Sequence, residues 1–442
     1  MIIPVYNGGD HLDRALTLLG FSEDPPLECI VVDDGSTDDS VAIAKRHGAT
    51  VLSTEGRCGP ARARNIGAEA AKGTILLFID SDVAVYPETL SKVAAEFAAD
   101  PELDAVMGSY DEDPSAPNFM SQYRNLMHCF VHQHSNREAT TFWTGCGAIR
   151  KHVFMEFGGF DVSYHAAAIE DIELGYRMSG GGRKLALSPS IRAKHLKRWS
   201  MRSMIKADFL YRALPWAELV LRSGKMPNDL NLRVSQRISV SLVFTLGSLG
   251  AYLAVSRGVY FLVPLFVTFF ILLSYYWLEC SKKDHRVITT LMVILMATIA
   301  VLSYISHLKL IFFMVLLCWI ALFARHRYTY PLSVWNQRTG IVVGACCLLV
   351  IGAVWLLLPL HRLGTVFLIG FTVLVALNTQ FYMFLAGQRG KLFALAAIPF
   401  HLLYFLSSGL AFMIAVVKSK LGHLKSTEPL PGSAAKAKPP VR

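Results

Sequence analysis

The sequence has few charged residues, and it lacks the motifs of several protein classes. Asp, Glu, Lys and Arg make up 17% of its 442 residues, whereas hydrophobic residues make up 53%. This composition is too apolar for a fully soluble protein. No nucleic-acid-binding motif is present, and the aromatic residues lie mainly in long apolar stretches. We therefore expect a chain that is partly embedded in a membrane and has no nucleic acid partner.

The eight cysteines form no C-x-x-C motif and have no regular spacing. Cys346 and Cys347, for example, lie inside an apolar stretch. This usage indicates reduced core cysteines and a soluble part that faces the cytosol. No signal peptide is recognisable, because residues 1–5 already have the pattern of a strand interior, which is unusual for an initiator methionine.

Basic residues outnumber acidic ones, which gives a formal charge of +10. Residues 418–442 contain six basic residues and one acid. Such a segment favours an anionic membrane surface over nucleic acid. We predict that residues 418–442 form a basic disordered tail and that membrane lipids are partners of the protein.

Long apolar stretches follow residue 237. Six of them lack Asp, Glu, Lys and Arg and are near or above the ~18–20 residues that cross a bilayer. They are residues 238–256, 258–278, 287–306, 339–360, 363–388 and 392–417. The shorter stretch 310–324 would be a seventh span, but seven spans would put the basic tail outside the cytoplasm, against the usual charge bias. We predict a multi-pass, all-α domain in the plasma (inner) membrane over residues 238–417, with six or seven helices.

The first half of the chain alternates apolar stretches with helical patterns. The apolar stretches predict strands at residues 2–5, 28–32, 50–53, 74–79 and 103–109. This alternation predicts an α/β catalytic domain at residues 1–198, with a Rossmann-like, mostly parallel sheet.

Two carboxylates follow the apolar stretch 74–79, which has the composition of a strand buried on both faces. Asp80 and Asp82 would lie at the carboxyl edge of the sheet, where α/β proteins bind ligands. Their oxygens suit Mg²⁺ or Mn²⁺, ions that usually also hold phosphate oxygens. The alternative is an ordinary surface turn, because Asp and Ser are common in turns.

Three further patterns have both a functional and a structural interpretation. His128 and His132 share a helix face as zinc ligands can, but no third ligand is recognisable, so we favour a surface helix at residues 118–134. Residues 144–147 and 158–161 predict glycine turns where backbone approaches a ligand. The acids at 169–175 either serve chemistry or complement a helix dipole.

Residues 199–237 form a basic, amphipathic segment. Methionine, leucine and aromatic residues alternate there with arginine and lysine, as in helices that lie in the membrane interface. The alternative is a helix that docks on the soluble domain. Pro215 is expected to break or kink the helix.

Five short motifs occur in a fixed order over about residues 1–200. They are Ile-Ile-Pro-Val-Tyr-Asn at 2–7, Val-Val-Asp-Asp-Gly-Ser-Thr-Asp at 31–38, Ala-Arg-Asn-Ile-Gly at 63–67, Asp-Ser-Asp at 80–82, and Glu-Asp with Glu-Leu-Gly at 170–175. Together they resemble the family 2 glycosyltransferases, which have the GT-A fold.

The resemblance implies roles for individual residues. Asp33 and Asp34 correspond to acids that bind the nucleotide base or ribose, and Asp80 and Asp82 to the pair that holds a metal on the diphosphate. Asp171 corresponds to the general base, and we group Glu170 with it as catalytic. To the donor site we also assign Pro4, Tyr6, Asn7, Gly35, Arg64 and Ser81. To the acceptor site we assign Gly145, Cys146, Gly147, Arg198 and Trp199.

We therefore expect a metal-dependent, inverting glycosyltransferase that transfers a sugar from a nucleotide-sugar donor to a lipid-linked or glycan hydroxyl at the membrane. Processive members of the family carry Q-x-x-R-W, where His195 here replaces the Gln, so a processive polysaccharide synthase is a less favoured alternative. A polyprenyl-phosphate glycosyltransferase is another. A transporter or flippase with a degenerate transferase domain is the rival from a different class, because several spans are compatible with it.

Overall fold

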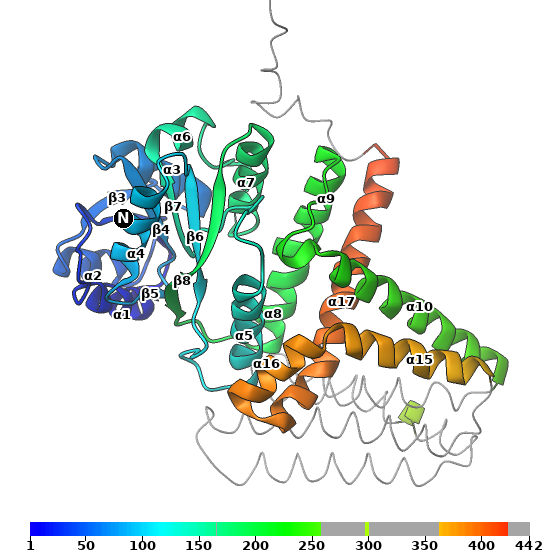
Figure 1. Cartoon of the computed structure of the whole chain (residues 1–442). Helices are drawn as coiled ribbons and strands as arrows, with labels where there is room; N and C mark the ends of the chain where they lie inside the picture. The colour runs from blue at the N-terminus through cyan, green and yellow to red at the C-terminus, as the bar shows by residue number, and fades with distance from the viewer. Residues whose placement is uncertain (165, 258–296, 300–361, 423–442) are drawn as a thin grey trace, which may run out of the picture.

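The computed structural model describes residues 1–164, 166–257, 297–299 and 362–422 (Figure 1). Its first part is an eight-stranded sheet in the order β3-β2-β1-β4-β7-β6-β8-β5. The strands are β1 (Ile2–Val5), β2 (Ile30–Asp33), β3 (Thr50–Ser53), β4 (Ile75–Ile79), β5 (Val83–Val85), β6 (Ala105–Tyr110), β7 (Cys146–Arg150) and β8 (Leu185–His195). The five predicted strands are β1, β2, β3, β4 and β6, so the α/β prediction is confirmed.

The sheet is mixed: four of its seven strand pairings are parallel, so the predicted parallel majority is narrow, and the antiparallel pairings were not predicted. Strands β3, β2, β1 and β4 are parallel neighbours, and β6 pairs in parallel with β8. Strand β7, however, runs antiparallel to β4 and β6, and β5 runs antiparallel to β8. Strand β7 was not predicted, because Gly145 and Gly147 have the pattern of a turn. A Cβ at Gly145 would instead overlap the ring of Trp143, and a Cβ at Gly147 would overlap the ring of Phe142 and the carbonyl oxygen of Trp143.

Helices cover both faces of the sheet. Successive residues of each strand point to opposite sides, so the apolar strands present apolar side chains on both faces. In β1, for example, Ile2 belongs to one core cluster and Ile3 to the other. One face packs on α3 (Pro60–Ala70), α6 (Lys151–Glu156) and α7 (Glu170–Gly180). The other packs on α1 (Gly9–Leu19), α2 (Ser40–Arg46) and α4 (Thr89–Ala99). The core strands are therefore buried on both faces, as their sequence predicts.

Helix α5 (Phe119–Gln133) is buried, so the prediction of a surface helix there is wrong. Cys129 packs into the core under the sheet. Phe119 instead packs against the rings of Phe393 and Phe400 in the C-terminal helices. A helix covered on two sides carries apolar residues all round, and α5 thus joins the α/β part to the C-terminal helices.

The segment after the sheet is helical and docks on the α/β part. It consists of α8 (Met201–Lys206), a π-helix η1 (Ala207–Ala213) and α9 (Leu214–Ser223). Pro215 lies in the first turn of α9, directly after the π-helix, and the helical backbone continues past it. Leu219 of α9 packs with Ile169 and Tyr176 next to and within α7. A short 3₁₀ turn, η2 (Leu230–Leu232), follows.

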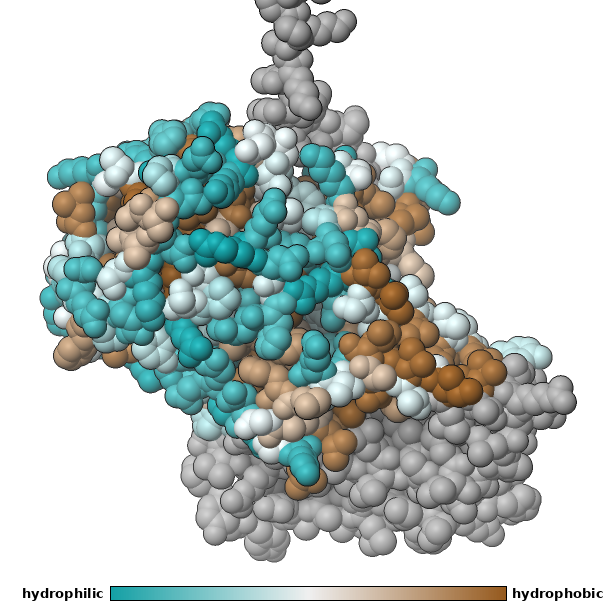
Figure 2. All heavy atoms as spheres, viewed as in Figure 1, coloured by the Kyte–Doolittle hydropathy of each residue, from teal (hydrophilic) through white to brown (hydrophobic). Residues whose placement is uncertain are grey.

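The C-terminal helices that the structure describes are α10 (Val234–Arg257), α15 (Arg362–Leu377), α16 (Thr379–Arg389) and α17 (Lys391–Lys420). Figure 2 shows hydrophilic residues over the α/β part and hydrophobic residues gathered over these helices. Within the described residues, α17 is long and apolar enough to cross a bilayer, and the stretch 363–388 is bent by 61° near Asn378. The predicted spans at 258–278, 310–324 and 339–360, and most of 287–306, lie outside the described residues.

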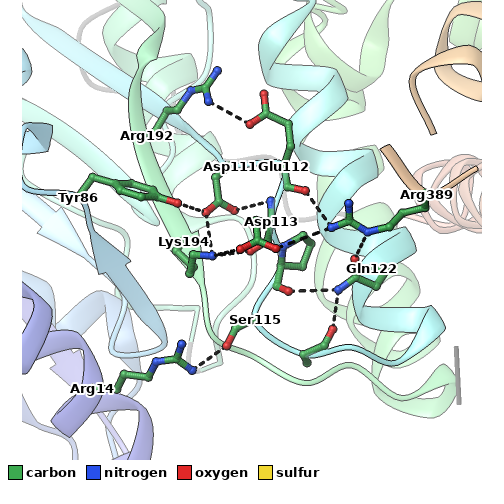
Figure 3. A network of polar contacts seen from close by, with 12 residues as sticks. Arg14, Tyr86, Asp111, Glu112, Asp113, Ser115, Gln122, Arg192, Lys194 and Arg389 are labelled. Carbon is green, nitrogen blue, oxygen red and sulfur yellow. Dashed lines mark hydrogen bonds and ion pairs between the residues drawn. The ribbon is translucent and has the colours of Figure 1, made fainter. Parts of the chain in front are cut away.

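Arg389, at the end of α16, ties the C-terminal helices to the loop between β6 and α5 (Figure 3). Its guanidinium donates to Gln122 Oε1 at 2.6 Å and to the carbonyl oxygen of Glu112 at 3.0 Å. The same loop is held from the sheet side by Lys194, which bonds to Asp113 at 2.6 Å. The loop is therefore clamped between β8 and the C-terminal helices.

We expect Arg389→Ala to destabilise this junction by about 1.5–3 kcal/mol, because hydrogen bonds of charged groups contribute about that much. The midpoint of thermal unfolding of the full chain in detergent should fall by a few degrees. The matched control is Arg14→Ala, because Arg14 bonds to Ser115 of the same loop at 2.7 Å from within the α/β part. Equal effects of the two changes would contradict a specific contribution of Arg389 to the junction.

Candidate active site

A cavity of about 1110 Å³ opens at the carboxyl ends of β1 and β4. It extends past α5 and η1 and continues between α9, α10 and α17. Its volume is at the upper end of the range that small-molecule sites occupy. The cavity therefore has room for more than one substrate group, and its two ends differ in chemistry.

The acids of the cavity are held by one buried arginine. Arg64 of α3 donates to Asp80 Oδ1 at 2.6 Å and to Glu170 Oε1 at 2.7 Å, and its side chain is 4% exposed. Burial alone would lower the pKa of Arg64, but Asp80 and Glu170 outweigh it and raise the pKa. Arg64 therefore positions two carboxylates from distant parts of the chain.

Asp82 lies in the same cavity and is held ionised. Burial raises its pKa, but His195 and Lys197 outweigh that effect and hold the pKa well below its usual range. His195 Nε2 and Lys197 Nζ lie 3.6 Å and 3.5 Å from Asp82 Oδ2. His195, which replaces the Gln of the processive motif, therefore contacts one of the two predicted metal ligands.

The oxygen donors of Asp80 and Asp82 fit a hard divalent cation such as Mg²⁺ or Mn²⁺. Arg64 occupies Oδ1 of Asp80, and the ionised state of Asp82 suits a cation. Among the described residues, no group of three or more His, Cys, Asp or Glu side chains could hold a metal. A cation at this pair would therefore need ligands from a substrate, such as phosphate oxygens.

Asp171, in the first turn of α7, is a partly buried acid of the cavity, and its pKa is raised. Burial and the charge of Glu170 raise its pKa to about 6, against hydrogen bonds that favour the ionised form. Thr144 donates to Asp171 Oδ2 from its backbone N–H at 3.1 Å and from its hydroxyl at 3.2 Å. The two hydrogen bonds orient this carboxylate, and its pKa lies near neutral pH. A general base requires both properties.

This pKa predicts the pH dependence of turnover. Below about pH 6 Asp171 is increasingly protonated and cannot accept a proton, so kcat/KM should fall about tenfold per pH unit below that value and level off above it. Initial rates between pH 4.5 and 8, with saturating donor and with acceptor well below its KM, would measure this profile. A kcat/KM that does not change across pH 6 would contradict the prediction that protonation of Asp171 lowers it.

The predicted donor residues divide between the cavity wall and the loops behind it. Pro4, Tyr6, Asn7, Asp34, Arg64, Asp80 and Ser81 line the cavity. Asp34 accepts from the backbone N–H groups of Cys58 and Gly59 at 2.8 Å and 2.9 Å, so it also fixes the loop before α3. Asp33 and Gly35 do not line the cavity: Asp33 accepts from the Ser36 N–H, and Gly35 packs on the backbone of Gly56.

The predicted acceptor residues are mostly not at the cavity surface. Gly145, Cys146 and Gly147 lie in or next to β7 and do not line the cavity, whereas the preceding Trp143 and Thr144 do. Arg198 is exposed and outside the cavity. Trp199 lines it, and the Lys197 ammonium lies 4.8 Å from the centre of its ring.

Several cavity residues carried no functional prediction. Arg57 lies over the ring of Tyr6, with its guanidinium carbon 4.2 Å from the ring centre. The cavity lining also includes Trp143, Arg124, Asp208, Arg212 and Trp216, together with His128, for which the zinc interpretation was not favoured. Arg124 precedes His128 by one helical turn, and Asp208 precedes Arg212 by one turn, so charge spacing within helices was the available signal.

Comparison with known proteins finds a family model that matches the first part of the chain. Residues 1–158 match the model of glycosyl transferase family 2. An uncharacterized glycosyltransferase of Escherichia coli (strain K12) is 40% identical over 103 residues, which are 22% of this chain and 30% of that protein. The validoxylamine A glucosyltransferase of Streptomyces hygroscopicus subsp. limoneus is 28% identical over 224 residues, which are 42% of this chain and 49% of that protein.

Among solved structures, a mannosyltransferase of Pyrobaculum calidifontis in complex with GDP-Man and Mn²⁺ is similar, with 20% identity and a TM-score of 0.46. The match covers 58% of this chain and 74% of that one. The chain spans between 30% and 49% of the length of these two curated relatives.

Proposed function

Residues 1–158 form a glycosyl transferase family 2 domain, and from that premise we propose that the protein transfers a sugar from a nucleotide-sugar donor to a hydroxyl acceptor at a membrane. We propose a GT-A fold for this domain, inversion at the anomeric carbon, and a requirement for Mg²⁺ or Mn²⁺. The observation that carries the proposal is the joining of Asp80 and Glu170 by Arg64, next to Asp171, in one cavity.

The donor would occupy the sheet end of the cavity. Tyr6 and Arg57 offer a flat ring and a cation at its mouth, which suit a nucleotide base and its phosphates. A divalent cation held by Asp80 and Asp82 would neutralise negative charge on the diphosphate as it leaves. Lys197 adds a fixed positive charge to the same wall.

The acceptor would be activated from the other side. Asp171 would take the proton from the acceptor hydroxyl, whose oxygen then bonds to the anomeric carbon as the nucleoside diphosphate leaves with the bonding electrons. Thr144 orients Asp171 through two hydrogen bonds. Glu170 is bonded to Arg64 and to the Ala168 N–H, so we assign it a positioning role.

We further propose that the C-terminal helices associate with a bacterial-type inner membrane and that the α/β part lies on its cytosolic side. Helix α17 passes the length and hydropathy requirements for a span. Large exposed apolar side chains support this, including Leu392, Leu395, Leu406, Leu410, Phe412, Met413 and Val417 of α17. The multi-pass arrangement over 238–417, and the division into domains at 198 and 237, are part of this proposal.

The test is a donor screen. The full chain in detergent would be given a panel of nucleotide sugars with divalent metal, and released nucleotide would be measured. Release from one donor above the others supports the transferase. Tight binding of a nucleotide sugar without any release, even by water, would favour a transporter that has kept a degenerate domain.

A further inference from the structure

The helix end of the cavity is an apolar groove. It is lined by Val240 and Phe244 of α10 and by Tyr404, Gly409, Phe412 and Met413 of α17. A Cβ at Gly409 would overlap Val240 and Phe244, so this glycine lets α10 and α17 approach closely. Phe412 and Met413 are 37% and 45% exposed, which places the mouth of the groove among the exposed apolar residues of α17.

A charged cluster separates this groove from the catalytic acids. Arg124 of α5 pairs with Asp208 of η1 at 2.8 Å, and Arg212 lies one turn further along at 3.8 Å from the same carboxylate. All three side chains line the cavity. Two guanidinium groups thus share one carboxylate, which leaves one positive charge without a partner in the cluster.

Arg124 has unused hydrogen-bonding capacity. Its side chain is 8% exposed, and its Nε has no hydrogen-bond partner within the described part of the chain. The Arg212 side chain is 40% exposed and lines the cavity, so its charge is accessible to a ligand there. A buried donor that lacks a partner is costly, so an anion with several oxygens would complete this cluster.

The three regions follow one another along a single cavity. Asp171 is near enough to Arg212 to influence its charge, and Tyr404 of the groove is near enough to Asp208 and Arg212 to be influenced by theirs. The order along the cavity is therefore catalytic acids, surplus positive charge and apolar groove. A π-helix carries Asp208 and Arg212, and π-turns are frequent at functional sites. A ligand that fits this order has a polar head, an anionic link and an apolar chain.

We propose that the acceptor is a phosphate-linked lipid, with its hydroxyl-bearing head at Asp171, its phosphate or diphosphate at Arg124 and Arg212, and its chain in the groove between α10 and α17. This inference rests on the proposed function. The head hydroxyl loses its proton to Asp171 and gains the sugar, and the phosphate of the acceptor keeps all of its bonds.

The binding test uses radiolabelled dodecyl phosphate and dodecanol with the full chain in neutral phosphatidylcholine nanodiscs, and empty nanodiscs give the background. Arg212→Gln should weaken dodecyl phosphate binding by about tenfold or more, the loss expected for a charge-assisted contact, with little effect on dodecanol. The matched control is Arg222→Gln, because Arg222 is on α9 but outside the cavity lining.

A tryptophan introduced into the groove tests whether the apolar chain of the ligand binds there. Ser241 of α10 lines the cavity, whereas Ser248, two turns further along, does not. Ser241→Trp should weaken both probes, and Ser248→Trp should weaken neither. Equal binding by Arg212→Gln and Arg222→Gln would overturn the phosphate position, and equal binding by the two tryptophan variants would overturn the groove.

Two further arms separate the sources of phosphate. Inorganic phosphate that displaces dodecyl phosphate as well as unlabelled dodecyl phosphate does would show a site for soluble phosphate and overturn the lipid assignment. Loss of probe binding in nanodiscs that contain phosphatidylglycerol would show a bilayer headgroup site and overturn the acceptor assignment. Release of nucleotide from the donor by water, measured on the wild-type chain without probe, tests the transferase separately: release without the expected binding pattern overturns this inference alone.

Discussion

Replacing Asp171 by asparagine is expected to lower the transfer rate by ~10²–10⁴, the range typical of a lost general base. The amide keeps the shape of the side chain, and it can still accept from Thr144, but it cannot take a proton from an acceptor hydroxyl. Donor affinity should change little, because Asp171 bonds to Thr144, whereas the predicted metal ligands Asp80 and Asp82 contact Arg64, His195 and Lys197. Turnover with acceptor and donor titration on the same preparation would measure both quantities.

The control for this experiment is Asp161→Asn, because Asp161 is exposed and lies outside the cavity. It should retain wild-type turnover. Near-wild-type turnover of Asp171→Asn would contradict the base assignment and favour an acceptor that is already anionic, such as a lipid phosphate acting as nucleophile. A lost donor affinity would instead place Asp171 in the nucleotide site.

Removal of divalent metal should abolish turnover, and added Mg²⁺ or Mn²⁺ should restore it. The two carboxylates of Asp80 and Asp82 face a cavity that would also receive a diphosphate, and negative groups repel one another unless a cation lies between them. The comparison is between initial rates in excess chelator and after metal is returned. Full activity in excess chelator would contradict the requirement for a divalent metal.

The variant Asp82→Asn tests whether Asp82 is a ligand of the metal. The change removes one carboxylate and leaves His195 and Lys197 beside a neutral amide. We expect the metal concentration for half-maximal rate to rise by at least tenfold, while the thermal unfolding midpoint stays within a few degrees of wild type. An unchanged metal requirement in Asp82→Asn would show that Asp82 is not a ligand.

The strands and their acidic ends could be predicted because the signals are local. The run of apolar residues before Asp80 shows a buried strand, and the carboxylates at its end show where the sheet edge lies. Likewise, the acids that open α7 are recognisable as a helix start. These features depend on residues a few positions apart, which a pattern in the sequence records directly.

The partners of these acids could not be predicted in the same way. Arg64 meets Glu170 across 106 positions of sequence, and Arg124 meets Asp208 only because α5 and η1 lie side by side in the fold. Such pairs have no spacing rule. Strand β7 was missed for a related reason: its glycines make room for Phe142 and Trp143, a packing role that looks like a turn when only the sequence is known.

The apolar stretch 363–388 shows a third limit. Its composition predicts one span, and the two helices over this stretch, α15 and α16, meet at a 61° bend near Asn378. The Asn378 amide donates to Ser239 of α10 at 3.0 Å and to the carbonyl oxygen of Leu374 at 2.8 Å. A polar side chain that finds partners in a neighbouring helix makes such a bend stable, and hydropathy does not record it.

Side-chain contacts near both ends of helix α17 hold it against the rest of the structure. Arg389, just before it, bonds to Gln122 of α5, and Lys418 pairs with Glu218 of α9 at 2.9 Å. The groove wall that α17 provides is therefore fixed relative to Asp171. If the acceptor binds as proposed, this fixed distance acts as a ruler: only an acceptor whose hydroxyl lies the right length from its lipid chain reaches the base. The product is one sugar longer, so its new end passes beyond the base, and each lipid would leave with a single added sugar.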